Sequence, residues 1–149
     1  MEEEGEDMAK TGRFLHSVVN GEDIAGVGTS YDVTKYHLFD LNVIQSIGTL
    51  NPFKGFLRSM IIRATSITGG ASKVTFRICC DANGDYTVLG DTEVAFDLGL
   101  TTATTGCAQV LFDDYPFWEA LTQSDNVYVF YKVDAGSVTI DLAQINWSE

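Results

Sequence analysis

The stretch that decides the fold is residues 126–147, NVYVFYKVDAGSVTIDLAQINW. Residues 127–133 are almost all β-branched or aromatic, and such residues favour a pleated, half-buried strand over a helix. Residues 134–137 follow with an Asp at the first position of a turn and a Gly that can take positive φ. We therefore predict a hairpin of two strands joined by a tight turn.

The second strand of this hairpin changes phase. Apolar residues alternate with polar ones up to Leu142, and the next apolar pair is Ile145 and Trp147. Because a slip of one residue would turn the whole set outward, we expect a β-bulge near Ala143 or Gln144. A hairpin as apolar as this one needs a second sheet over it.

Alternation of apolar and polar residues predicts eight or nine strands in all. Residues 56–65 are nearly continuous in β-favouring residues, as expected for a strand covered on both faces. The sequence therefore predicts an all-β fold, a two-sheet antiparallel sandwich that is jelly-roll-like and has an extended N-terminal arm. An immunoglobulin-like sandwich is the alternative. The remaining strands are expected at about 13–19, before Lys35, and at 36–46, 74–80, 88–89, 94–98 and 107–113.

Three connections carry distinct signals. Residues 81–85, DANGD, resemble the opening of a calcium loop, but Gly84 stands at the fourth position and no Glu stands at the twelfth. We interpret them as a hairpin turn built on Asn83 and Gly84. Gly90 and Asp91 predict a turn between two short strands. Residues 114–121 predict a short helix or a wide turn, because proline suits a first helical turn.

The charge is strongly acidic and uneven. The chain has 149 residues, with 9 Lys and Arg against 21 Asp and Glu, which gives a net charge of −12. This balance argues against a nucleic-acid partner and suits a partner with basic patches. No apolar run approaches the roughly 20 residues of a membrane helix.

We predict an acidic arm over residues 1–11 and one sandwich domain over 12–149. The arm holds the acids Glu2, Glu3, Glu4, Glu6 and Asp7.

The cysteines and histidines predict neither a disulfide nor a metal site. Cys79 and Cys80 are adjacent, so in a strand they point to opposite faces, and Cys107 is distant in sequence. Three such thiols are typical of reduced cysteines in a cytosolic setting. His16 and His37 lie outside any ligand spacing. We expect no cofactor.

No arrangement of residues predicts catalysis. The nucleophile elbow, the P-loop and the His-Glu-x-x-His motif are all missing, and the carboxylates Asp113 and Asp114 are adjacent, so they face apart in a strand. We predict that the chain is not an enzyme. The aromatic cluster of Tyr115, Phe117 and Trp118 could stack on a sugar or anchor a protein partner, or it could cap one end of the core.

Four stretches carry a resemblance to a known group. They are residues 72–78 (SKVTFRI), 81–85 (DANGD), 101–106 (TTATTG) and 128–136 (YVFYKVDAG). With these in order, residues 56–147 resemble small β-sandwich virion proteins of tailed bacteriophages. The likeness is one of pattern and composition, and it assigns no functional residue.

The resemblance implies a virion structural protein, either a capsid decoration (cement) protein or part of an appendage. Such a protein would be assembled in the bacterial host cytoplasm, and it would bind and stabilise the assembled phage head through the acidic arm and one face of the sandwich. The implied partners are the major capsid protein or other virion proteins, and copies of the chain in a homo-oligomer such as a trimer. The alternative is a carbohydrate- or receptor-binding domain of a tail appendage that uses the aromatic cluster.

Overall fold

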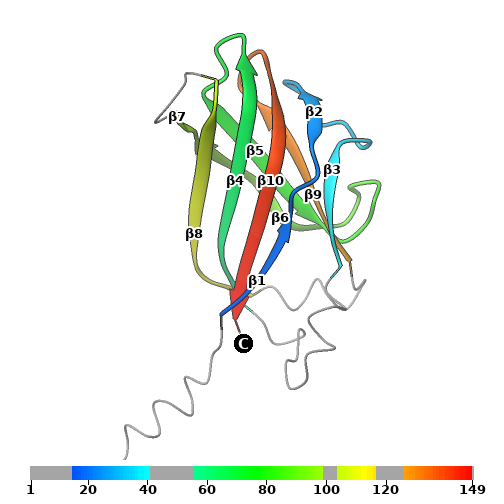
Figure 1. Cartoon of the computed structure of the whole chain (residues 1–149). Coiled ribbons are helices and arrows are strands. Elements are labelled where there is room, and N and C mark those ends of the chain that lie inside the picture. Colours follow the sequence, from blue (N-terminus) through cyan, green and yellow to red (C-terminus); the bar gives the residue numbers. More distant parts are fainter. Residues whose placement is uncertain (1–14, 41–55, 99–103, 117–125, 149) are drawn as a thin grey trace, which may run out of the picture.

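The computed structural model describes residues 15–40, 56–98, 104–116 and 126–148. These residues form ten strands and no helix (Figure 1). The predicted arm over residues 1–11 and the predicted domain boundary at residue 12 therefore lie outside the described residues. The strands are β1 (Leu15–Asn20), β2 (Ile24–Val27), β3 (Tyr36–Asp40), β4 (Phe56–Thr68), β5 (Lys73–Cys79), β6 (Thr87–Ala95), β7 (Asp97–Leu98), β8 (Gly106–Pro116), β9 (Asn126–Val133) and β10 (Ser137–Ser148).

The strands form two antiparallel sheets packed face to face. Sheet A has six strands, in the order β1-β10-β4-β8-β7 with β2 also paired to β10. Sheet B has four strands, in the order β3-β9-β5-β6. In Figure 1 sheet A lies in front and sheet B behind it. The predicted antiparallel sandwich is confirmed.

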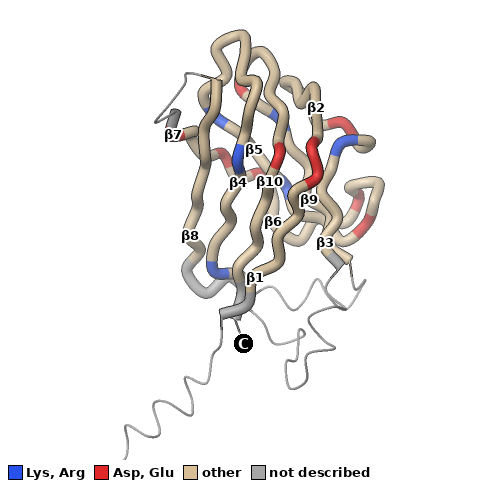
Figure 2. Tube along the Cα trace, viewed as in Figure 1, with Lys and Arg blue, Asp and Glu red and all other residues tan. Residues whose placement is uncertain are grey.

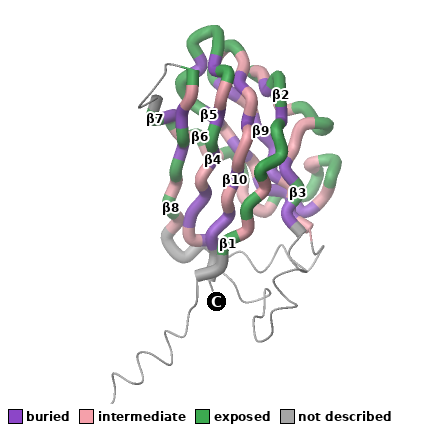
Figure 3. The backbone as a smooth tube through the Cα atoms, viewed as in Figure 1, coloured by how far each residue is buried: buried purple, intermediate pink, exposed green. Residues whose placement is uncertain are grey.

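The core lies between the sheets and follows from the period of two in each strand. On β5 the alternate side chains of Val74, Phe76 and Ile78 are buried, the residues between them are partly exposed, and Cys79 at the end of the strand is buried as well. Figure 3 shows buried and less buried positions alternating along the strands. Only one face of β4 is buried, because Arg63 is exposed on the other face. The expectation that residues 56–65 are covered on both faces is therefore wrong. The ladders of β4 also contain four register shifts, three against β10 and one against β8, so its nearly continuous apolar run is not a regular strand with two buried faces.

The predicted hairpin of β9 and β10 is wrong, because these strands belong to different sheets. The turn between them is present, with Gly136 at φ 62°, but it carries the chain from sheet B to sheet A. It packs against the connection from β4 to β5, which lies at the same end of the sandwich (Figure 1). The alternation of apolar and polar residues in two successive strands is the same whether the strands pair in one sheet or face each other across the core. The sequence pattern therefore could not show that β9 and β10 lie in different sheets.

Asp134 joins these two connections. Its carboxylate accepts hydrogen bonds from the Ser72 hydroxyl at 2.7 Å and from the backbone N–H groups of Ser72 and Lys73 at 2.9 and 3.0 Å. The bonds from Ser72, and then that from Lys73, lower the pKa of Asp134 to about 2. The ionised carboxylate therefore holds the two sheet-crossing connections together.

We expect Asp134→Ala to lower the free energy of unfolding by about 1–2 kcal/mol, the scale for losing a carboxylate that caps backbone N–H groups. Since the folded pKa lies below the unfolded value, this stability is present above about pH 4 and is lost as the pH falls toward 2. Urea unfolding at pH 7 and pH 3 measures it, with Asp85→Ala as the control on another connection. Equal losses for both variants at pH 7 would contradict the role of Asp134.

The predicted bulge in β10 is confirmed slightly earlier than expected. Its register against β4 shifts between Ile140 and Leu142. The buried positions accordingly change phase, from Val138 and Ile140 to Ala143 and Ile145. The bulge keeps the apolar side chains of β10 pointing into the core after the phase of the apolar-polar alternation changes.

Two other connections differ from expectation. Gly90 and Asp91 lie within the continuous strand β6, so the predicted turn there is wrong. The register of β5 against β6 shifts between Phe76 and Ile78, and this irregularity accommodates the glycine without ending the strand.

Pro116 pairs with Phe56 as the last residue of β8, so residues 114–116 are strand and not helix. Proline is tolerated here because the position is a strand end.

Candidate functional site

The residues predicted to bind a partner are mostly outside the described part of the chain. This holds for Glu2, Glu3, Glu4, Glu6, Asp7, Phe117 and Trp118. Tyr115 lies in β8, where its backbone pairs with that of Leu57. The roles assigned to the acidic arm and to the aromatic cluster stay predictions.

The turn interpretation of residues 81–85 is confirmed. The Asp81 carboxylate accepts hydrogen bonds from the backbone N–H groups of Asn83, Asp85 and Tyr86 at 3.2, 3.0 and 2.8 Å. Its oxygens thus shape the connection between the paired strands β5 and β6. Within the described ranges, no three His, Cys, Asp or Glu side chains gather as a metal site requires.

The cysteines are free thiols in the structure. Cys79 and Cys80 are buried, and Cys107 is exposed. Burial raises the pKa of both buried thiols, which makes them poor nucleophiles at neutral pH. The described residues form no helix that is long and apolar enough to cross a membrane.

Two rows of side chains on the outer face of sheet A contain no charged residue. In one row the strand register aligns Ser17, Asn146, Ser59 and Leu111, and in the next it aligns Val19, Gln144, Ile61 and Gln109. We call these eight residues the uncharged face. In Figure 2 the strands of sheet A are mostly tan, in contrast with the loops beside them.

Two aliphatic side chains stand out from the uncharged face. Val19 is 53% exposed and Leu111 is 75% exposed, at opposite corners of the two rows. Neither is needed for the core, because the alternate residues of β1 and β8 face inward. Covering these two side chains would be favourable, because it removes apolar surface from water.

The polar side chains of this face bond to one another. Asn146 donates from Nδ2 to the Ser59 hydroxyl at 2.7 Å. The side-chain oxygen of Asn146, Oδ1, accepts hydrogen bonds from the Ser17 hydroxyl and, at 2.8 Å, from the side-chain amide of Gln144. Because these groups already have partners, covering them costs less than covering unpaired polar groups.

An ion pair marks one end of the uncharged face. Arg63 on β4 donates from Nη2 to Asp141 Oδ2 at 2.8 Å and from Nε to Asp141 Oδ1 at 3.0 Å. Asp141 lies at the bulge of β10, between Ile140 and Leu142, so the ion pair is located at the bulge. The two charges cancel, and the face next to them adds no net charge.

The outer face of sheet B is instead covered by loops of the chain. Tyr31, in the connection from β2 to β3, donates a hydrogen bond to Asp91 on β6 at 2.9 Å. The Arg77 guanidinium and the Lys132 ammonium lie 4.4 and 4.9 Å from the centre of its ring. Burial and the bond to Asp91 raise the pKa of Tyr31, so its hydroxyl stays protonated at neutral pH.

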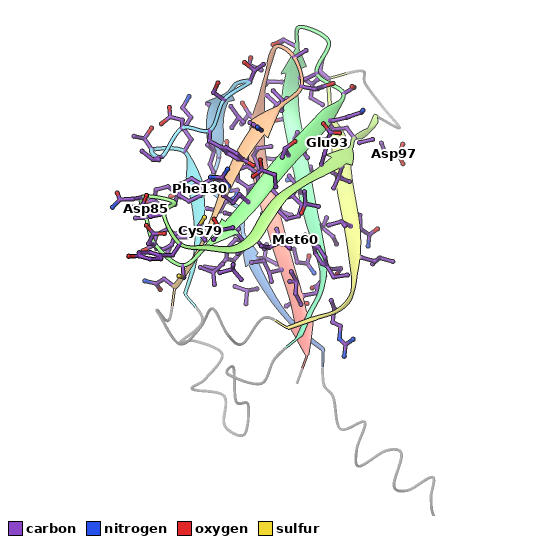
Figure 4. The ribbon with its side chains drawn as sticks, turned by 180° about the vertical axis from the view of Figure 1, so that it is seen from behind. Met60, Cys79, Asp85, Glu93, Asp97 and Phe130 are labelled. Atoms are coloured by element: carbon purple, nitrogen blue, oxygen red, sulfur yellow. The ribbon has the colours of Figure 1, made fainter. Side chains whose placement is uncertain are left out.

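The connection from β5 to β6 covers another part of sheet B. Gly84 comes so close to Phe130 that an added Cβ would lie 3.6 Å from the ring. Beside it, Tyr36 contacts Tyr128 and Phe130, with ring centres 5.3 and 5.5 Å apart. Figure 4 looks onto this side, with Phe130 on β9 and Asp85 on the covering connection. Loops of the chain thus cover parts of the outer face of sheet B. On the uncharged face of sheet A, four residues are exposed, two are partly exposed, and Ser59 and Asn146 are buried.

No family model and no curated protein matches the chain. Solved structures give distant likenesses of two kinds. A carbohydrate-binding module from the family 9 glycoside hydrolase Cel9A of Ruminococcus flavefaciens is 10% identical, with a TM-score of 0.49 over 91% of this chain and 98% of that one. The CBM35 of Cellvibrio japonicus Abf62 is 12% identical, with a TM-score of 0.44 over 87% and 92%.

A Tobacco streak virus coat protein dimer is the other kind. It is 14% identical, with a TM-score of 0.39 over 91% of this chain and 86% of that one. The structural neighbours thus include both carbohydrate-binding modules and viral coat proteins. At 10 to 14% identity they assign no ligand and no partner to this chain.

Proposed function

We propose that the chain is a virion structural protein, of the decoration or cement type, that attaches to the assembled head of a tailed phage and stabilises it. The observation that carries the proposal is the uncharged face of sheet A. On a chain with a net charge of −12, this face can be covered without burying an ion. Its exposed aliphatic corners and its paired polar groups suit the core of a protein interface.

The rest of the proposal follows from the charge and from the geometry of a shell. Five acids in the first seven residues would give ionic contacts with basic patches on the major capsid protein or another virion protein. We include a closed homo-oligomer, such as a trimer, because several linked copies on a symmetric shell bind with greater avidity. The proposed role is binding, with no catalytic step.

We expect Val19→Glu and Leu111→Glu each to lower the occupancy of the chain on phage heads by about tenfold or more, because each places an unpaired carboxylate inside the proposed contact. The measurement is the amount of purified chain that sediments with heads made without it. Val33→Glu is the matched control, because Val33 has the same 53% exposure as Val19 but lies in the connection from β2 to β3.

Both test variants should unfold at the same urea concentration as the parent chain, since both side chains lie outside the core. Occupancy equal to that of the Val33→Glu control would contradict attachment through the uncharged face. Equal loss in all three variants would show a general effect of charge and would also contradict it.

A second candidate function is that of a carbohydrate- or receptor-binding domain of a tail appendage. The observation in its favour is a hollow beside Tyr31, where an aromatic ring is held in a fixed position. Binding to a glycan array tests it. The predicted aromatic cluster at residues 115–118 is the other place where such binding could occur, and loss of binding in Trp118→Ala would favour that cluster.

A further inference from the structure

The connection from β2 to β3 forms an open hollow of about 590 Å³. It is lined by Gly26 and by residues 28–33, among them Thr29, Ser30, Tyr31 and Asp32. The hollow is shallow and open to solvent, so it would cover one face of a small ligand. It combines one aromatic ring with hydroxyl groups and a carboxylate, which is a mixed chemistry suited to a ligand that has both apolar and hydroxyl-bearing faces.

The ring of Tyr31 is fixed before any ligand arrives. Its hydroxyl is bonded to Asp91, and Arg77 also donates to Asp91, from Nε at 3.0 Å. Lys132 lies 3.9 Å from the other oxygen of Asp91. Two cations and one carboxylate from β5, β6 and β9 therefore hold the ring in one orientation, so binding would cost little ordering entropy.

Arg77 and Lys132 are not among the residues that line the hollow. Tyr31 lines it, and the two cations lie against the Tyr31 ring. Both cations pair with the carboxylate of Asp91. Because the ring already interacts with two cations, it has little attraction left for a cationic ligand.

Asp32 gives the hollow an acceptor and a negative charge. The Thr34 hydroxyl and backbone N–H donate to its Oδ1 at 2.6 and 2.9 Å, and these bonds lower the pKa of Asp32. The carboxylate is therefore ionised at neutral pH. It can accept hydrogen bonds from ligand hydroxyls and repels anionic ligands.

We infer that the hollow binds one ring of a neutral saccharide. The C–H face of the sugar would stack on Tyr31, and its hydroxyls would donate to Asp32 and bond with the hydroxyls of Thr29 and Ser30. The inference rests on the second candidate function and names its site. It is independent of attachment through the uncharged face, because none of the eight residues of that face lines the hollow.

The test is an array of immobilised neutral, sialylated and sulfated glycans, probed with the labelled full chain. We expect binding to neutral glycans and none to the anionic ones. Tyr31→Ala should weaken binding about tenfold or more, as loss of an aromatic anchor does. Tyr31→Phe keeps the ring and should bind within about threefold of the parent chain, since only the positioning bond to Asp91 is lost.

Two further variants distinguish loss of the binding site from disruption of the connection between β2 and β3. Ser30→Trp fills the hollow while leaving Tyr31 and its cations in place, and it should abolish binding. Tyr86→Ala removes an aromatic side chain that is 66% exposed on the connection from β5 to β6, and it should change nothing. Circular dichroism and urea unfolding confirm that each variant folds.

The inference is overturned if no neutral glycan binds, if only anionic glycans bind, or if Tyr31→Ala and Ser30→Trp bind as the parent chain does. Binding that is lost only in Trp118→Ala would support the second candidate function and reject this site. None of these outcomes depends on the attachment of Val19→Glu or Leu111→Glu to phage heads, so the two proposals can fail separately.

Discussion

Gly136→Ala is expected to lower the free energy of unfolding by more than about 3 kcal/mol, which is a large effect for a change of one methyl group. At φ 62°, an L side chain is strained by roughly 1–2 kcal/mol. The added Cβ would also lie 2.0 Å from the Thr68 carbonyl oxygen and 2.7 Å from Gly69 Cα. Both neighbours are backbone atoms, so rotating a side chain cannot relieve the clash.

Urea unfolding followed by circular dichroism measures this effect, and two glycines serve as controls. Gly70 has φ 84° but no atom within 4 Å of an added Cβ, so Gly70→Ala should cost only the strain. Gly90 has neither a positive φ nor a close neighbour, so Gly90→Ala should be nearly neutral. If Gly136→Ala proved as stable as Gly70→Ala, the two sheet-crossing connections would not be in contact.

The second large effect concerns His37, which is fully buried between the sheets. Its Nε2 lies 2.6 Å from the Glu22 carbonyl oxygen, and its Nδ1 lies 2.7 Å from the hydroxyl of Tyr131. The carbonyl can only accept, so Nε2 carries the proton and Nδ1 accepts from the tyrosine. Burial lowers the pKa of His37, because the charged form is poorly solvated, and it raises that of Tyr131.

We expect the sandwich to lose stability as the pH falls below about 6.5. The unfolded chain takes up a proton at that pH, whereas folded His37 resists protonation, so stability is full above about 6.5 and falls toward the lower folded pKa. Within that interval the loss is at most about 1.4 kcal/mol per pH unit, the limit for uptake of one proton. Glu22, Asp23 and Asp141 reduce it by favouring the charged form.

Unfolding of the parent chain and of His37→Phe at pH 5 to 7.5 tests this prediction. The variant should be less stable at pH 7 by about 1–3 kcal/mol, because the buried hydroxyl of Tyr131 loses its acceptor. It should also lose most of the pH dependence, although His16 remains. His37→Phe combined with Tyr131→Phe should recover part of the lost stability. An unchanged pH dependence in the variant would contradict a neutral, buried His37.

Alternation predicted most strands, and the phase slip after Leu142 predicted the bulge of β10. The same signal could not tell which strands pair. The turn residues Asp134 and Gly136 were identified correctly, but their main contacts are with Ser72 and Thr68 on another connection. Contacts of this kind join segments more than 60 residues apart, and nothing in the local pattern reports them.

The same limit applies to the surfaces. The sequence drew attention to residues 1–11 and 115–118 because acids and aromatic residues cluster there. The uncharged face is assembled from β1, β10, β4 and β8, whose outward residues are ordinary in sequence. The hollow at Tyr31 depends on Asp91, which lies 60 residues away at a position that reads as a turn. Each surface becomes visible only once the strand order is known.

The central claim is that the chain works by attachment through the uncharged face of sheet A. A cryo-electron microscopy reconstruction of tailed-phage particles that carry the chain tests it most directly. The account predicts sandwich density on the head, with β1, β10, β4 and β8 turned toward the shell and Val19 and Leu111 covered. Particles in which these strands face solvent, or in which the chain is absent from the head, would contradict it.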